Sequence, residues 1–232
     1  MRVLELGTGT GDVAIMAAER VGPLGSVLAT DASEEMVRTA SLAMREAGAR
    51  SVNVRRMDAR AIDVQDATFD VVLARMVLMF VEDPTDTLKG VARVLAQGGR
   101  FAGTTWAALA NNPYHAAIIE VARDRGPLPE PAPEIVRAYG LSDPDALMRA
   151  AEAAGFSDVE VRRVIGERRV PSIADEVAKQ KTWPLFAGVF ALLDDTQKAS
   201  AWTEVERRWR AFELPDGGGI FPSEVLVLGA SR

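Results

Sequence analysis

The chain has 232 residues, 48% of them hydrophobic and 26% charged, which is enough for one well-buried α/β domain with an appended subdomain. Its net charge is −6, and it has one histidine and no cysteine, so disulfides, thiolate metal sites and histidine-rich metal centres are excluded. We expect no metal and no nucleic-acid partner. No apolar run reaches the roughly 18 residues of a membrane span, and no secretory leader is evident, so we expect a cytoplasmic protein.

Strand-like and helix-like segments alternate through the first two thirds of the chain. Short apolar runs predict strands at 2–6, 26–30, 51–57, 69–74 and 100–105. Capping residues, prolines and glycines predict helices between them at 12–20, 33–47 and 83–97. This alternation predicts a doubly wound, mostly parallel sheet with helices on both faces.

The pattern changes after the fifth strand. Residues 106–142 are rich in proline and predict a loop with a short helix, and a helix opened by Asp143 leads into a sixth strand at 158–165. A helical stretch follows at 172–213, and a last strand is predicted at 224–230. We expect a core of residues 1–171 and 220–232, with a helical lid inserted over 172–219.

A glycine turn, Glu5-Leu6-Gly7-Thr8-Gly9-Thr10-Gly11, joins the first strand to the first helix. Glycine permits positive φ and close approach of a ligand, and such a turn at the carboxyl edge of a parallel sheet is typical of nucleotide-type sites. The glycines fall at every second position and no Gly-Lys-Ser/Thr follows, so it is neither a P-loop nor a dinucleotide fingerprint. Asp12 would repel a pyrophosphate from the helix start. We predict a nucleoside-like ligand.

Carboxylates end the next two strands. Asp31 lies 20 residues after Gly11, a spacing that suits a carboxylate binding two ribose hydroxyls. Asp58 ends the third strand and could accept a hydrogen bond from an adenine amine. The competing interpretations are a helix cap for Asp31 and a surface turn for Asp58. The preceding glycine turn favours the ribose role for Asp31.

These features resemble the class I S-adenosylmethionine-dependent methyltransferases, and in particular the small-molecule enzymes of ubiquinone and menaquinone biosynthesis. Besides the glycine turn and the two carboxylates, the resemblance rests on ARMVLMFVEDP (74–84), VARVLAQGGRF (91–101) and LMRAAEAAGFSDVEV (147–161). It implies a Rossmann-like sheet with an antiparallel last strand and S-adenosylmethionine as cofactor. It also implies methyl transfer to a small, largely apolar molecule such as a quinol, a phenol or a natural product.

The resemblance implies how the cofactor would be held. The turn residues that would surround its methionine part are Gly7, Thr8, Gly9 and Gly11. Glu5 would lie beneath and orient the amino group, and Arg75 would lie near the methionine carboxylate or the sulfonium. Asp31 would bind the ribose.

At the adenine end, the resemblance assigns four further residues. Met57 and Ala32 would flank the ring on its two sides. Asp58, together with the backbone of Ala59, would meet the exocyclic amine. These four residues follow the second and third predicted strands, so the resemblance puts the adenine beyond the carboxyl ends of those strands.

The acceptor site is implied to lie beyond the fifth strand. His115 is a candidate catalytic base, with a helix-start or surface histidine as the competing interpretation. Trp106 and Tyr114 are candidate substrate-binding residues, with core packing as their alternative. Relatives often carry histidine at the position of Phe80, so one polar contact near the methyl group is expected to be lost.

Relatives usually have helices before the first strand, and here the strand comes at once. We expect an open cofactor cleft, weak cofactor affinity and a homodimer that covers the exposed face. Two alternative functions remain. A non-catalytic cofactor-binding or scaffold protein is favoured slightly by this start and by Phe80, whereas the glycine spacing argues against an NAD-dependent oxidoreductase.

Overall fold

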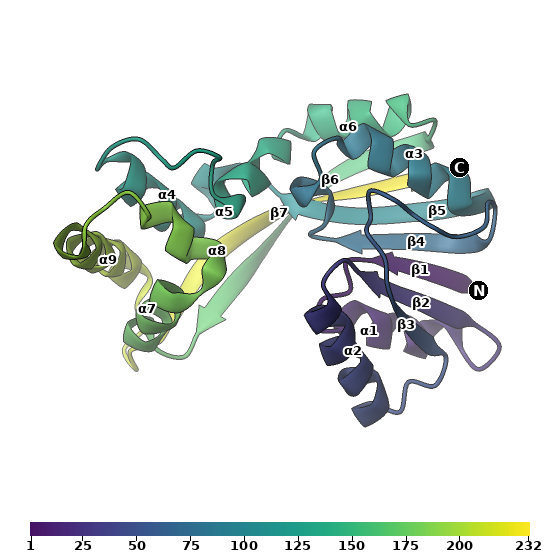
Figure 1. The fold of residues 1–232 in the computed structure, drawn as a ribbon, viewed down its shortest axis with the longest axis horizontal. Helices are drawn as coiled ribbons and strands as arrows, with labels where there is room; N and C mark the ends of the chain where they lie inside the picture. Colours follow the sequence, from purple (N-terminus) through teal and green to yellow (C-terminus); the bar gives the residue numbers. More distant parts are fainter. The chain divides into compact units, whose positions relative to one another are not determined.

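The chain folds into two compact units (Figure 1). The computed structural model describes residues 1–232 except for the side chains of Pro184 and Ala187. Unit 1 comprises residues 1–105, 143–162 and 226–232, and unit 2 comprises residues 106–142 and 163–225.

Seven strands of the described chain form one sheet in the order β3-β2-β1-β4-β5-β7-β6. Their bounds are β1 (Arg2–Leu6), β2 (Ser26–Asp31), β3 (Val52–Arg56), β4 (Phe69–Arg75), β5 (Leu95–Trp106), β6 (Ser157–Val170) and β7 (Gly219–Ser231). Strands β1 to β5 pair in parallel. Backbone hydrogen bonds join Gly99 to Arg232 at one end of β5 and Ala107 to Glu224 at the other, so β7 runs antiparallel to β5. The predicted mostly parallel sheet with an antiparallel last strand is confirmed.

Four helices accompany the sheet in unit 1: α1 (Asp12–Val21), α2 (Glu34–Glu46), α3 (Pro84–Val94) and α6 (Pro144–Ala153). Side-chain caps set three of their starts, because Ser33, Asp83 and Asp143 each accept a hydrogen bond from a backbone N–H in the first turn. Helices α1 and α2 lie beside β1 to β3, whereas α3 and α6 lie against each other at the β5–β7 side (Figure 1). The apolar core under α1 includes Val3 and Val27.

Unit 2 is built around an aromatic core. Its helices are α4 (Pro113–Arg123), α5 (Glu134–Arg137), α7 (Ile173–Thr182), α8 (Pro184–Ala187) and α9 (Asp195–Trp209). Helix α4 contacts α9, and α7 contacts both α8 and α9. Trp209, Phe190 and Phe221 are almost fully buried among them. Strands β6 and β7 continue from unit 1 into unit 2.

The glycine pair after α3 does not end that helix as the sequence predicts. Helix α3 ends at Val94, and Leu95 already pairs with Phe69 in the sheet. Gly98 instead adopts a φ of 74° inside β5, where the β4–β5 register shifts. The two glycines therefore lie in an irregular part of β5 and not at a helix end. The sequence alone cannot distinguish these two roles.

The predicted lid, residues 172–219, lies within a larger unit. Residues 106–142, expected as a loop with a short helix, contain the 11-residue helix α4, whose buried side chains pack against α9. This packing joins 106–142 to residues 163–225. The sixth and last strands are also longer than predicted, at 157–170 and 219–231.

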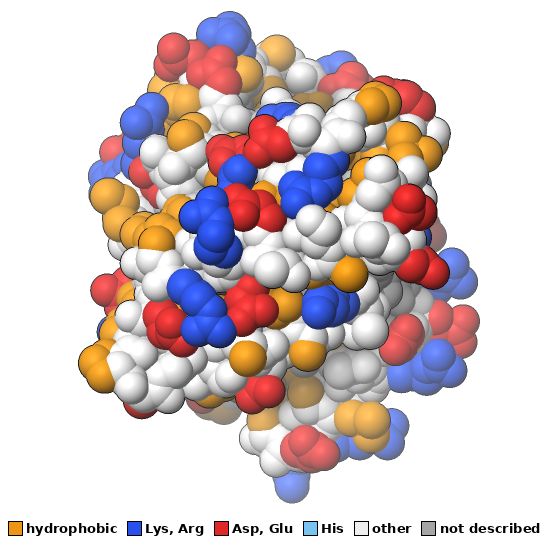
Figure 2. Space-filling model, turned by 90° about the vertical axis from the view of Figure 1, so that its left-hand side faces the viewer, with side chains coloured by type: hydrophobic (Ala, Val, Ile, Leu, Met, Phe, Trp, Pro, Cys, Tyr) orange, Lys and Arg blue, Asp and Glu red, His pale blue; other side chains and the backbone are white. Residues whose placement is uncertain are grey.

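Charges of both signs alternate on the face drawn in Figure 2. On α9, Arg208 lies within 3.1 Å of carboxylate oxygens of Glu120, Asp124 and Glu204. The basic run near the end of α9 is therefore paired with acids. Searching the described residues for a helix long and apolar enough to cross a bilayer finds none.

Candidate active site

The glycine turn adopts the left-handed backbone that its composition predicts. Gly7, Gly9 and Gly11 have φ values of 64°, 55° and 94°. A Cβ added to Gly7 would lie 2.4 Å from a methyl carbon of Val77, whereas a Cβ on Gly9 would meet no atom within 4 Å. Gly7 is therefore packed against the segment after β4, and Gly9 faces open space where a ligand could approach.

Asp31 is tied directly to this turn. Its Oδ2 accepts a 2.9 Å hydrogen bond from the backbone N–H of Gly9, and its Oδ1 accepts one from the N–H of Ser33, also at 2.9 Å. Ser33, not Asp31, caps α2. A carboxylate has roughly four acceptor sites, so about two remain free for a ligand.

Glu5 is a buried carboxylate beneath the turn, 1% exposed. The Thr8 hydroxyl donates to its Oε2 at 2.7 Å. Burial raises the pKa of Glu5 above its ordinary value, and the Thr8 hydrogen bond and the positive charge of Arg75 oppose that rise. Glu5 also lines a cavity of about 180 Å³ whose other lining residues are Gly7, Thr8, Gly9, Thr10, Asp12, Val13, Arg75 and Met76.

The residue after Arg75 has an unusual backbone. Met76 has a φ of 58°, and its N–H donates to the carbonyl oxygen of Thr104 at 3.0 Å and to the Thr104 Oγ1 at 3.1 Å. Arg75 was predicted from the sequence as a site residue, whereas Met76 and Thr104 were not. Methionine carries no turn signal, and only its place directly after a strand could have pointed to it.

The predicted adenine-side residues follow β2 and β3 and do not line the cavity. Met57 is buried, and Asp58 accepts hydrogen bonds from the side chain and the backbone N–H of Arg60. These bonds lower the pKa of Asp58 below its ordinary value. Ala32 and Ala59 are less buried than Met57. A ligand amine at Asp58 would have to share the carboxylate with Arg60.

His115 lies in unit 2, in the first turn of α4, and is not a surface residue. It is 5% exposed, its Nδ1 lies 2.7 Å from the Tyr139 hydroxyl, and its ring meets Trp106 edge-on at 4.7 Å. Burial lowers the pKa of His115 to about 3, so the imidazole is neutral at physiological pH.

Tyr114 is enclosed by its neighbours in unit 2. Its hydroxyl donates to Glu176 Oε1 at 2.5 Å, its ring stacks on Trp209 at 4.4 Å, and the Arg168 guanidinium lies 4.1 Å from the ring centre. Burial raises the pKa of the Tyr114 hydroxyl. Burial alone would raise the pKa of Glu176, but hydrogen bonds from Tyr114, Gln180 and Arg168 outweigh it and lower that pKa.

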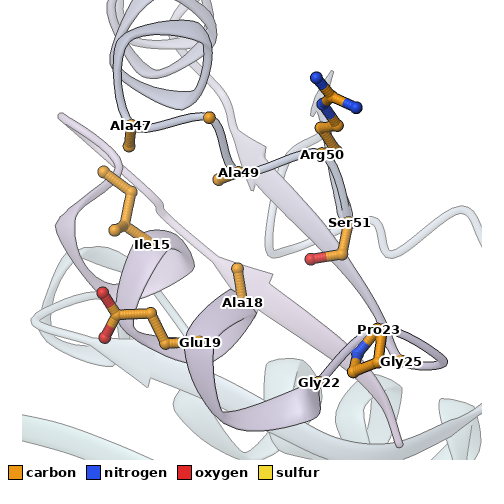
Figure 3. Close-up of a pocket in the computed structure, with 11 residues that line it drawn as sticks. Ile15, Ala18, Glu19, Gly22, Pro23, Gly25, Ala47, Ala49, Arg50 and Ser51 are labelled. Carbon is orange, nitrogen blue, oxygen red and sulfur yellow. The ribbon is translucent and has the colours of Figure 1, made fainter.

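A larger hollow of about 750 Å³ lies elsewhere in unit 1 (Figure 3). It opens beside the end of α1 and the start of β3, so it is at the amino ends of the strands, whereas parallel α/β sheets bind ligands at the carboxyl ends. The loop N–H groups of Ala49 and Arg50 are already bonded to Met44 and Gly48 carbonyls. We therefore take the cavity at the glycine turn, and not this hollow, as the candidate active site.

Comparisons with known proteins identify the family of this chain. A family model described as a methyltransferase domain matches residues 3–99. Nocamycin O-methyltransferase of Saccharothrix syringae is 30% identical over 216 residues, which is 88% of this chain and 76% of that protein. The ubiquinone/menaquinone biosynthesis C-methyltransferase UbiE of Serratia proteamaculans is 31% identical over 176 residues, covering 71% of this chain and 70% of that protein.

A solved structure adds to these matches. The S-adenosylmethionine-dependent methyltransferase from Aquifex aeolicus is 26% identical, with a TM-score of 0.53, and the match covers 71% of this chain and 75% of that one. These matches favour the methyltransferase over the NAD-dependent and non-catalytic alternatives. The chain belongs to the S-adenosylmethionine-dependent methyltransferases that act on small molecules, with S-adenosylmethionine as its cofactor.

Proposed function

We propose that the glycine turn and Asp31 hold S-adenosylmethionine, and that the enzyme methylates a hydroxyl oxygen of a small, largely apolar acceptor. The observation that carries the cofactor placement is the pair of hydrogen bonds that fix Asp31 to Gly9 and Ser33. They hold a carboxylate with free acceptor sites beside a turn that is open at Gly9. Two adjacent ribose hydroxyls are donors that fit this carboxylate.

The methionine end of the cofactor would lie over the cavity at the turn. Gly7, Thr8, Gly9 and Gly11 supply the backbone around it, Glu5 orients its amino group through the turn, and Arg75 meets its carboxylate. The support is electrostatic: Glu5 and Arg75 line one cavity with opposite charges, and an amino acid carries the complementary pair.

At the adenine end, Met57 and Ala32 would flank the ring. Asp58 and the Ala59 backbone would bind the amine. Arg60 is the competitor for Asp58, because its guanidinium lies 2.6 Å from an Asp58 oxygen. Both side chains are substantially exposed, so this ion pair is weak and can open for a ligand.

When bound, the cofactor supplies a methyl group on a sulfonium, an electrophilic carbon that needs alignment and a dry site. His115 is the proposed base that takes the acceptor's hydroxyl proton. The imidazole is neutral and can accept a proton at Nε2 when Nδ1–H donates to Tyr139, although its lowered pKa makes it a weak base. We propose that Trp106 and Tyr114 shape the acceptor site, Tyr114 indirectly because its hydroxyl is bound by Glu176.

Oxygen is favoured as the methylated atom by the extent of one match. The similarity to nocamycin O-methyltransferase covers 88% of this chain, against 73% for the phosphatidylethanolamine N-methyltransferase of Cereibacter sphaeroides and 71% for the C-methyltransferase UbiE of Serratia proteamaculans. A panel of phenols, quinols and amines, assayed with methyl-labelled S-adenosylmethionine, tests the proposal. We expect O-methylated products. Products labelled only on nitrogen or carbon would overturn the oxygen assignment, and cofactor binding without any product would favour the non-catalytic alternative.

We also propose a cytoplasmic enzyme that forms a homodimer and binds no nucleic acid. Acidic net charge supports the last point. Size-exclusion chromatography with light scattering measures the mass of the assembly. An electrophoretic mobility shift assay with duplex DNA tests nucleic-acid binding. A monomer, or a shifted DNA band, would contradict the corresponding point.

A further inference from the structure

The corner after β4 has a backbone conformation that its sequence does not favour. Met76 has a φ of 58°, in the left-handed region that residues with a Cβ normally avoid. Strained backbone of this kind persists only where the surrounding structure holds it, and it is enriched at functional sites. Met76 lines the cavity at the glycine turn, so the strained residue lies at the site itself.

Thr104 supplies the restraint. In the β4–β5 register Thr104 lies opposite Arg75, the residue just before the corner. Both its carbonyl oxygen and its Oγ1 accept from the Met76 N–H, at 3.0 and 3.1 Å. Two acceptors on one donor fix where the chain turns after Arg75. In an ordinary parallel pair, backbone hydrogen bonds alone join the two strands. The bond to the Thr104 hydroxyl is therefore additional to the sheet pairing.

The corner also forms one wall of the turn. Val77 packs so closely on Gly7 that a Cβ there would lie 2.4 Å from its methyl carbon. Of the described residues that line the cavity, Arg75 is the one cation, and Glu5 and Asp12 are acids. An anionic part of a ligand in this cavity can therefore be recognised by the Arg75 side chain, whose start the corner fixes.

We propose that the Met76–Thr104 corner holds Arg75 in the position from which its guanidinium meets the carboxylate of the cofactor. This rests on the proposed cofactor placement and adds to it. Thr104 is a positioning residue that acts through Met76 and Arg75. S-adenosylhomocysteine, which has the carboxylate, and 5′-methylthioadenosine, which lacks it, are the two probes that isolate the contact.

Calorimetry on the full chain measures both dissociation constants for the wild type, Thr104→Val and Thr104→Ser. Valine keeps the shape but removes the acceptor, whereas serine keeps it. We expect the wild type to prefer S-adenosylhomocysteine, and Thr104→Val to lose about fivefold of that preference, the worth of one hydrogen bond. Methylthioadenosine affinity should not change, and Thr104→Ser should retain the preference.

Two further comparisons separate positioning from general stability. In an Arg75→Met background, Thr104→Val should leave the preference unchanged, because the group that it positions is gone. Met76→Gly should melt at a higher temperature than Met76→Ala and keep more of the preference, since glycine alone accepts this φ without strain. At an ordinary helix or strand φ the order of the two melting temperatures would be reversed.

The outcomes distinguish this inference from the proposed function. A wild type that binds both probes equally overturns the inference alone, as does Thr104→Val weakening both probes by the same factor. Met76→Ala being as stable as Met76→Gly would also overturn it. A wild type that binds neither probe overturns the proposed cofactor placement, and the inference with it.

Discussion

Glu5 in unit 1 and Glu176 in unit 2 are both buried carboxylates, but their hydrogen bonding differs. Glu176 in unit 2 is 7% exposed, and its Oε1 accepts from Tyr114, Gln180 and Arg168. Glu5 in unit 1 is 1% exposed and has the Thr8 hydroxyl as its side-chain donor. The pKa of Glu176 is lowered, and that of Glu5 is raised by burial. Three side chains of unit 2 hold Glu176 in place, whereas Glu5 lines the cavity at the glycine turn.

Removing the Glu176 carboxylate is expected to have the largest effect on stability. Glu176→Ala leaves the Tyr114 hydroxyl and the Gln180 amide buried without their acceptor, so we expect a loss of about 2–3 kcal/mol of unfolding free energy. Urea denaturation measures this loss. The control is Glu206→Ala, which removes a partly exposed ion pair with Arg210 and is expected to change stability by under about 0.5 kcal/mol. Equal effects of the two substitutions would mean that Glu176 does not stabilise unit 2.

His115 extends the comparison to pH. It is neutral when folded, with a pKa of about 3, against 6.5 for the free side chain. The unfolded chain therefore binds a proton that the native state does not, and the stability present above pH 6.5 is lost as the pH falls. Between pH 6.5 and 5 this group removes about 2 kcal/mol. Unfolding measured at both pH values should show this loss in the wild type and a smaller one in His115→Asn; parallel curves would contradict it.

Gly9 and Gly48 sharpen the contrast between a binding turn and a structural one. Both have positive φ, and an added Cβ meets nothing within 4 Å at either. We expect Gly9→Ala and Gly48→Ala each to lose about 1 kcal/mol of unfolding free energy. Calorimetry should show weaker S-adenosylhomocysteine binding for Gly9→Ala alone. Equal affinity for the two variants would remove the glycine turn from the site.

The smallest expected change in stability comes from replacing Glu5 with glutamine, and its sign is opposite to that expected at Glu176. Because its folded pKa is raised, Glu5 makes folding less favourable as the pH rises above its ordinary pKa of 4.5. Glu5→Gln should therefore raise stability slightly at pH 7 and flatten the pH dependence above 4.5, whereas Glu176→Gln should lower stability. Thermal melts at pH 5 and 7 provide the check, and a destabilised Glu5→Gln would remove the distinction.

Much of unit 1 could be predicted from the sequence, because its signals are local. The glycine spacing predicted the turn at 7–11. The 20-residue spacing from Gly11 to the end of the second strand predicted the role of Asp31. The left-handed Met76 could not be predicted, since its conformation is imposed by Thr104, which is distant in the chain. The irregularity at Gly98 looked like a helix stop. Helix α4 belongs to unit 2 because it contacts α9, and no local sequence pattern predicts that contact.

The structure of the complex with S-adenosylhomocysteine is the most direct measurement of whether the glycine turn and its carboxylate grip a nucleoside. We predict both ribose hydroxyls within about 2.6–3.2 Å of the Asp31 oxygens, with the sugar passing over Gly9. A ligand bound in the hollow beside α1 and β3, or an Asp31 side chain turned away from the sugar, would contradict the account.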